Sequence, residues 1–106
     1  MEKSSLITNL KNNLEKDSFF QIISREYDLK IYIFGSFFKK EKPNDLDILI
    51  TYNDALKLEN YIEFKNEISR LFLGMNLSLK IDLLFLSSGE EIELNFVGNE
   101  SAQSLF

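Results

Sequence analysis

Residues 33–50 read IFGSFFKKEKPNDLDILI. They hold the end of one predicted strand, a charged loop and most of a second predicted strand. The apolar run before Gly35 has the length and the β-branched and aromatic residues typical of a buried strand, which we expect over 29–34. A polar loop over 39–44 leads into a second predicted strand over 46–52. Because this loop is too short for a helical crossover, we expect the two strands to be antiparallel.

Two aspartates open the second predicted strand. Side chains alternate along a strand, so Asp45 and Asp47 project to the same face, with Cα atoms about 6.6 Å apart. Such carboxylates can share one or two Mg²⁺ or Mn²⁺ ions, which also accept oxygen ligands from a nucleoside triphosphate. Asp82 lies in a later predicted strand over 77–85, on the side away from its apolar face. We expect Asp82 to complete the metal site if the two strands are neighbours.

Gly35 and Ser36 follow the first predicted strand. Because glycine has no Cβ, backbone N–H groups there can approach a phosphate, and the serine adds a hydroxyl donor. Lys39 and Lys40, with Lys42, form a small basic cluster in an acidic protein. This cluster is as consistent with a solvated loop as with contact to a triphosphate.

Each of these features alone has a simpler structural interpretation. An Asp-x-Asp pair is more often a solvated strand edge or a turn cap, a Gly-Ser pair is more often a turn, and a single aspartate is more often an exposed strand residue. The coincidence of all three in one short chain favours a site that binds metal and a nucleoside triphosphate.

The composition excludes several other chemistries. The 106 residues include neither cysteine nor histidine, which excludes thiolate nucleophiles, zinc sites built on these residues and imidazole-based triads. The net charge of −5 argues against broad nucleic-acid binding, and no apolar run approaches the ~20 residues that span a bilayer. We therefore expect a single cytoplasmic domain over 1–106 that makes no membrane contact.

The remaining segments are predicted to be helical, except for the strand that carries Asp82. The expected caps are Ser4 or Ser5, Ser18, Asn53 or Asp54, and a capping box of Ser88 with Glu91. The segment from Ser18 is either a second helix or a kinked continuation of the first. The third helix is expected to turn one face to the core, with Leu58, Tyr61, Ile62, Ile68 and Phe72 on it. The order of elements predicts an α+β (α/β) fold, a small mixed sheet with its helices on one side.

The end of the chain is expected to be ordered. We predict that the last helix runs to about Val97 and that Gly98 lies beyond its end. Leu105 and Phe106, the last two residues, are both expected to dock against the domain, because each is large and apolar.

These motifs together resemble the minimal nucleotidyltransferases of the DNA polymerase β superfamily. The segments that carry the resemblance are Gly35-Ser36, Asp45-Leu46-Asp47 and Lys80-Ile81-Asp82-Leu83-Leu84, and it covers nearly the whole chain. The resemblance implies the polymerase β-like fold. It also implies that the Gly-Ser pair binds phosphate and that the three aspartates are the catalytic metal ligands.

Two departures from the family pattern concern the triphosphate. The loop after Ser36 is shorter than usual, and Phe37 stands where the family often has an arginine. Lys39, Lys40 or Lys42 would have to supply the missing positive charge.

The resemblance further implies a function and a partner. Many minimal nucleotidyltransferases are antitoxins that silence a helical HEPN-type ribonuclease toxin by transferring AMP from ATP to a toxin hydroxyl. We therefore expect a metal-dependent protein adenylyltransferase that pairs with a HEPN-type protein, as a homo- or hetero-oligomer. The alternative is a weak or inactive binding module that neutralises its partner by occlusion, and a purely structural protein ranks last. Substituting Asp45 and Asp47 with Asn separates the first two, because only an enzyme would lose protection.

Overall fold

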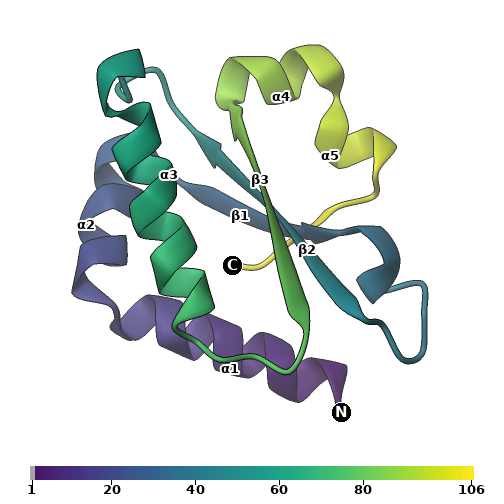
Figure 1. Ribbon diagram of the computed structural model, residues 1–106. Coiled ribbons are helices and arrows are strands. Elements are labelled where there is room, and N and C mark those ends of the chain that lie inside the picture. The colour runs from purple at the N-terminus through teal and green to yellow at the C-terminus, as the bar shows by residue number, and fades with distance from the viewer. Residues whose placement is uncertain (1) are drawn as a thin grey trace.

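A mixed four-stranded sheet lies at the centre of the fold (Figure 1). The computed structural model describes residues 2–106. In chain order the elements are α1 (Lys3–Lys16), α2 (Ser18–Tyr27), β1 (Lys30–Phe34), the 3₁₀ turn η1 (Gly35–Phe37), β2 (Asp45–Tyr52), α3 (Leu58–Leu73), β3 (Lys80–Ser87), α4 (Ser88–Leu94), α5 (Phe96–Asn99) and β4 (Gln103–Ser104). No helix in this part of the chain is long and apolar enough to cross a membrane.

The strand order in the sheet is β3-β2-β1-β4. Strand β1 is antiparallel to both β2 and β4, whereas β2 and β3 are parallel. The predicted α+β fold with a small mixed sheet is therefore confirmed, and so is the antiparallel first pair. The parallel pair requires a crossover, and α3 provides it.

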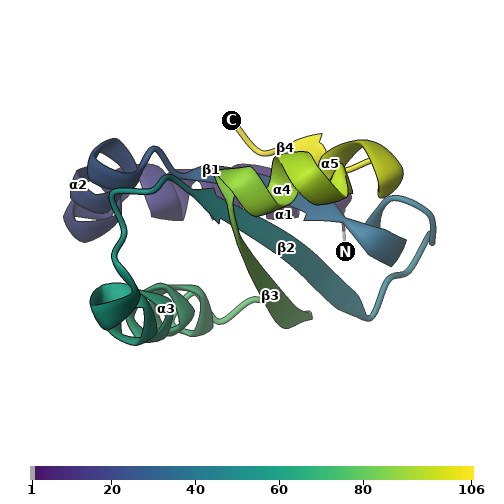
Figure 2. The same ribbon diagram turned by 90° about the horizontal axis from the view of Figure 1, so that it is seen from above.

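Helices cover both faces of the sheet, so the prediction of helices on one side was wrong. Figure 2 shows α3 on one side of the sheet and α4 with α5 on the other. The Phe34 ring of β1 packs edge-on against Phe96 of α5, with ring centroids 4.9 Å apart. Strand β2 carries buried apolar residues on both faces, because Leu49 is as fully buried as its neighbours Leu46 and Ile48. A strand of this kind needs cover on both sides.

The main core lies between the sheet and the first three helices. It includes Leu10, Leu14, Phe20, Ile31, Ile33, Phe37, Leu46, Ile48, Ile50, Ile68 and Phe72. Alternate residues of each strand contribute to it, as the period of a pleated strand requires. The opposite side chains of β2 and β3 are therefore left for the second face.

Helix α3 turns a different side to the core than predicted. Phe64, Ile68 and Phe72 are its buried residues. Leu58 and Ile62, which were predicted on the core face, are 89% and 71% exposed. Leu58 is the opening residue of the helix, and Ile62 lies about half a turn from Phe64 on the outer side.

The helix caps lie near the predicted positions but on other residues. Asp17 caps α2, because its Oδ1 accepts a hydrogen bond from the Phe20 N–H at 2.8 Å, and its extended backbone makes α1 and α2 separate helices. The capping box of α4 consists of Ser87 and Glu90, one residue before the predicted pair. The remaining observed N-caps are Glu2 for α1 and Lys57 for α3, in place of Ser4 or Ser5 and Asn53 or Asp54. Asn53 instead accepts a bond from the Ala55 N–H at 3.0 Å.

The last predicted helix is interrupted. Asn95 has a left-handed backbone (φ 48°), so α4 ends at Leu94 and α5 begins at Phe96. Gly98 lies within α5 and not beyond the helix, contrary to the prediction. An asparagine tolerates the left-handed conformation better than most residues, which explains why the chain turns there.

Only one of the two terminal apolar residues docks. Leu105 is buried, and its N–H donates to the carbonyl oxygen of Ile31 at 2.8 Å, next to the short β4 strand. Phe106 is 55% exposed, so its predicted docking was wrong. Pairing with β1 fixes the backbone, and successive side chains then point in opposite directions.

Candidate active site

Strand register brings the three predicted aspartates to one face of the sheet. Asp47 of β2 is the direct register partner of Asp82 of β3, and Asp45 is the partner of Lys80. Paired residues of neighbouring strands point to the same face, and residues two apart on one strand do so too. The expected neighbourhood of Asp82 with Asp45 and Asp47 is therefore confirmed, whereas their catalytic roles stay predictions.

Asp47 is the central carboxylate of this group. Its pKa is raised above the ordinary value, first by burial and then by the negative charges of Asp82 and Asp45. A side-chain hydrogen bond with Asp82 raises the pKa further, and the positive charge of Lys80 lowers it. The three acidic groups thus repel one another when ionised. Negative charge is concentrated around Asp47.

The same crowding suits a divalent cation. Within residues 2–106, no three acidic side chains stand in an arrangement that could hold a metal ion as they are placed. The neighbouring strands nevertheless hold the Cα atoms of Asp47 and Asp82 about 4.8 Å apart and those of Asp45 and Asp47 about 6.6 Å apart. Side-chain rotation alone can therefore turn the carboxylates toward a shared ion. Hard oxygen donors of this kind are the ligands that Mg²⁺ and Mn²⁺ prefer.

Gly35 lies against the Asp47 carboxylate. Its φ of +75° is in the left-handed region that favours glycine. A Cβ at this position would overlap the Asp47 carboxylate, with Cγ only 3.2 Å away, so any other residue here would force that carboxylate to move. The requirement for glycine therefore comes from the backbone turn and from the close carboxylate. The predicted phosphate contact at Gly35 stays a prediction.

The turn after Gly35 organises the basic loop. Ser36 lies in η1, and its carbonyl oxygen accepts hydrogen bonds from the N–H groups of Lys39 and Lys40 at 3.1 and 2.9 Å. Both lysine side chains are exposed, and neither forms an ion pair with any residue in the range 2–106. They remain able to meet an anion that approaches from solvent.

Lys80 is a charged neighbour of the site that the sequence analysis did not single out. Its Nζ lies 3.7 Å from Asp82 Oδ1, and both side chains are well exposed. An exposed pair of this kind contributes little to stability. Its position could have been inferred from spacing, because Lys80 precedes Asp82 by two residues on the same strand and so shares its face.

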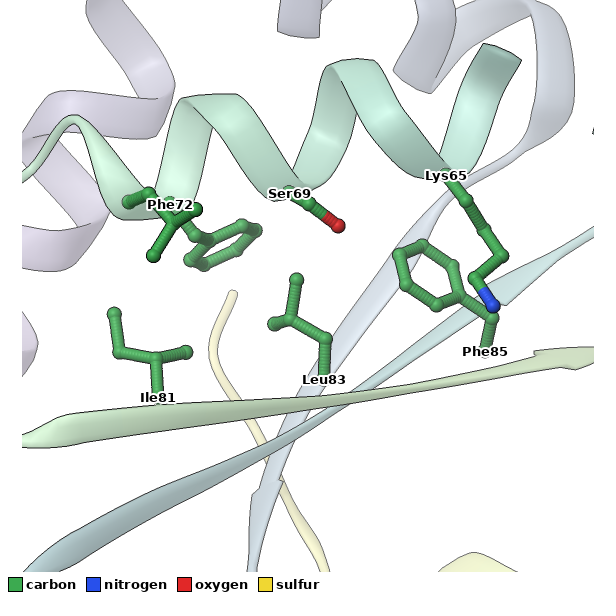
Figure 3. A pocket seen from close by; sticks show the side chains of 7 residues that line it. Lys65, Ser69, Phe72, Ile81, Leu83 and Phe85 are labelled. Carbon is green, nitrogen blue, oxygen red and sulfur yellow. The ribbon is translucent and has the colours of Figure 1, made fainter. Parts of the chain in front are cut away.

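A separate pocket lies on the opposite face of β3. Ile81, Leu83 and Phe85 point from β3 toward Phe72, Ser69 and Lys65 of α3 (Figure 3). The cavity has a volume of about 260 Å³ and its lining is largely apolar. Asp82 has the other parity on the strand and lies away from this cavity. The acidic site therefore lies on the second face of the sheet, and its three aspartates are partly exposed.

Comparison with known proteins places this geometry in a family. The family described as "Polymerase beta, Nucleotidyltransferase" matches residues 20–102, which include the Gly-Ser turn and all three aspartates. A protein of Methanocaldococcus jannaschii named "Putative protein adenylyltransferase MJ1217" is 34% identical over 85 residues, which are 77% of this chain and 80% of that protein. No solved structure matches the chain.

The family match covers the Gly-Ser turn and the strands β2 and β3, which are the segments that form the acidic site. Proteins of this family generally use a nucleoside triphosphate and a divalent metal, and the acidic face of β2 and β3 offers the oxygen ligands for such a metal. The chain belongs to the polymerase β nucleotidyltransferase family, and nucleotidyl transfer is its reaction class.

Proposed function

We propose that this protein transfers AMP from ATP to a hydroxyl group of a partner protein. The observation that carries the proposal is the shared face of Asp45, Asp47 and Asp82, with Gly35 directly against Asp47. The relative named as a protein adenylyltransferase supports AMP as the transferred group and a protein as the acceptor. We further propose that the partner is a HEPN-type toxin and that this protein is its antitoxin.

The phosphate groups of ATP are assigned to η1 and the loop after it. Gly35 has a positive φ and no side chain, so its backbone lies directly beside the Asp47 carboxylate and can be approached by the triphosphate from the solvent side. Ser36 offers its hydroxyl group as a donor, and Lys39 and Lys40 offer exposed ammonium groups. These groups would offset the negative charge that ATP brings to an acidic surface.

The metal is assigned to Asp45, Asp47 and Asp82. When bound there, Mg²⁺ or Mn²⁺ would supply Lewis-acid stabilisation of the negative charge on the reacting phosphate and on the departing pyrophosphate. Asp47 is the register partner of Asp82 and shares a strand face with Asp45, and the negative charges of both raise its pKa. It is therefore the carboxylate best placed to bind a cation jointly with each neighbour.

The proposed transfer is a single displacement at the α-phosphorus of ATP. The acceptor hydroxyl oxygen forms a bond to the α-phosphorus as the bond to the bridging oxygen of pyrophosphate breaks, and the bonding electrons leave with pyrophosphate. Asp82 takes the hydroxyl proton, directly or through a water molecule. Its half-exposed side chain, at 47% accessibility, is open to an acceptor from solvent.

The test uses the protein encoded by the adjacent reading frame as acceptor. Wild-type protein, ATP and Mg²⁺ are incubated with that acceptor, and its intact mass is measured. We expect a gain of one or more AMP units that is absent with Asp45→Asn or Asp47→Asn. A second measurement, growth during toxin expression, separates the alternative. If the Asn variants still protect cells and no mass is gained, the protein acts by occlusion and the proposal is wrong.

A further inference from the structure

A lysine of the first helix contacts the loop that follows the Gly-Ser turn. Lys3 lies in the first turn of α1, and its Nζ donates a hydrogen bond to the carbonyl oxygen of Lys40. The same Nζ lies 5.5 Å from the centroid of the Phe37 ring. One ammonium group therefore joins α1 to the end of η1 and to the loop after it.

The backbone of Lys40 is held from two sides. Its N–H donates to the Ser36 carbonyl oxygen at 2.9 Å, and its own carbonyl oxygen accepts from Lys3. Phe37 is fully buried, and its ring packs edge-on against Phe38 with centroids 5.2 Å apart. The loop thus begins from a fixed backbone. The side chain of Lys40 is nevertheless exposed to solvent.

Lys3, whose contact with the Lys40 carbonyl we call the tether, belongs to a helix that is packed firmly against the core. Leu6, Leu10 and Leu14 form the buried stripe of α1, and Leu6 lies less than one turn from Lys3. Burial of these residues sets the position of the helix, so Lys3 reaches the loop from a rigid support. Helix α1 lies outside residues 20–102, the part of the chain that matches the family.

We propose that Lys3 is a positioning residue that holds residues 38–44 in the conformation that receives the triphosphate of the nucleotide. Lys3 does not contact the substrate in this proposal. It removes conformational freedom that the loop would otherwise lose on binding, and Lys39 and Lys40 then meet the phosphates from a preorganised backbone. The inference rests on the proposed function for its substrate, whereas the tether is a contact of the free protein.

The experiment compares three substitutions in α1. Lys3→Met removes the ammonium group, and methionine and lysine have similar helix propensity, so the helix is retained. Lys3→Arg keeps a positively charged donor. Lys11→Met is the matched control, because it removes the same charge from the same helix two turns further along. The readouts are binding of the fluorescent analogue mant-ATP with Mg²⁺ and amide hydrogen exchange over residues 37–44 without nucleotide.

We expect Lys3→Met to raise the Kd for mant-ATP about tenfold, which corresponds to the loss of one hydrogen bond from a charged group. Exchange at the Lys39 and Lys40 amides should accelerate in the same variant. Lys3→Arg should restore most of both properties, and Lys11→Met should match the wild type. A structural role alone would not produce this combination of loop-specific exchange and rescue.

Two results would overturn the positioning role. One is unchanged exchange over residues 37–44 in Lys3→Met, and the other is faster exchange with an unchanged Kd. A wild-type protein that binds no mant-ATP in the presence of Mg²⁺ would instead contradict the proposed function itself. Normal wild-type binding with no effect of Lys3→Met would remove only the inference about Lys3.

Discussion

Asp47 and Asp82 lie directly opposite each other on the parallel strands β2 and β3. Paired residues of neighbouring strands point to the same face of the sheet, so these two carboxyl groups are close neighbours. The pKa of Asp47 is raised mainly by burial and then by the negative charges of Asp82 and Asp45. A divalent cation bound beside these carboxylates would offset their mutual repulsion. Without such a cation, the repulsion is expected to lower the free energy of unfolding.

Asp47→Asn should stabilise the metal-free protein while abolishing transfer. Because the folded-state pKa of Asp47 is raised, its ionised form costs stability at neutral pH, and Asn removes that cost. We expect a gain of about 0.5–2 kcal/mol, the usual range when a destabilising surface group is replaced, and a loss of activity of about 100-fold or more. Thermal unfolding in EDTA at pH 7 measures the first effect.

The stabilisation by Asp47→Asn should depend on pH. As the pH falls through the raised pKa of folded Asp47 toward the ordinary carboxyl value of 3.8, the wild-type carboxyl becomes protonated and its cost disappears. The advantage of the variant should therefore be complete at neutral pH and absent below about pH 3.8. Asp54→Asn, at an exposed loop position, is the charge-matched control and should show no such gain. Equal gains in the two variants would contradict the assignment.

Mg²⁺ or Mn²⁺ should stabilise the wild-type protein. A ligand that binds only the folded state at ten times its Kd adds about 1.4 kcal/mol to the free energy of unfolding. We expect a matching rise in Tm for the wild type and little or none for Asp47→Asn and Asp82→Asn. Titration of the metal during thermal unfolding gives the measurement. Equal Tm shifts in all three proteins would place the metal elsewhere.

Gly35→Ala should disrupt the site. The left-handed backbone at φ +75° costs an alanine about 1–2 kcal/mol, and its Cβ would collide with Asp47 Oδ2. We expect lower stability together with loss of nucleotide binding. Gly89→Ala is the control, because the nearest atom to a Cβ there is Ser87 Oγ at 4.0 Å and alanine favours the α4 helix. The stability difference between these variants is read from urea unfolding.

The same substitution at two positions of α3 tests which side of this helix faces the core. Ile68 is completely buried, so Ile68→Ala should lower the free energy of unfolding by about 2–5 kcal/mol. Ile62 is 71% exposed, and Ile62→Ala should stay within about 0.5 kcal/mol of the wild type. Chemical unfolding of both variants decides the point. Comparable losses of unfolding free energy in the two variants would mean that Ile62 faces the core, as the sequence predicted.

The position of α3 shows why part of the fold could not be predicted. Its apolar residues outnumber the places on one face, so periodicity alone did not separate the buried Phe64 from the exposed Ile62. Which of these residues is buried depends on how the helix packs against the strands beneath it. The caps show a related limit, since Asp17 and Ser18 are adjacent potential caps and the path of the chain between α1 and α2 selects Asp17.

The sequence by itself determined β1, β2 and, within a few residues, β3, together with the antiparallel first pair and the shared strand face of Asp45 and Asp47, because these follow from alternation and loop length over a few residues. The short strand β4 was not predicted. Tertiary structure alone decided that β3 lies beside β2, with Asp82 opposite Asp47, and that α5 crosses to the second face of the sheet. It also brought Lys3 to the carbonyl of Lys40. The physical reason is that pairing between distant segments depends on how the whole core packs, and no local pattern records it.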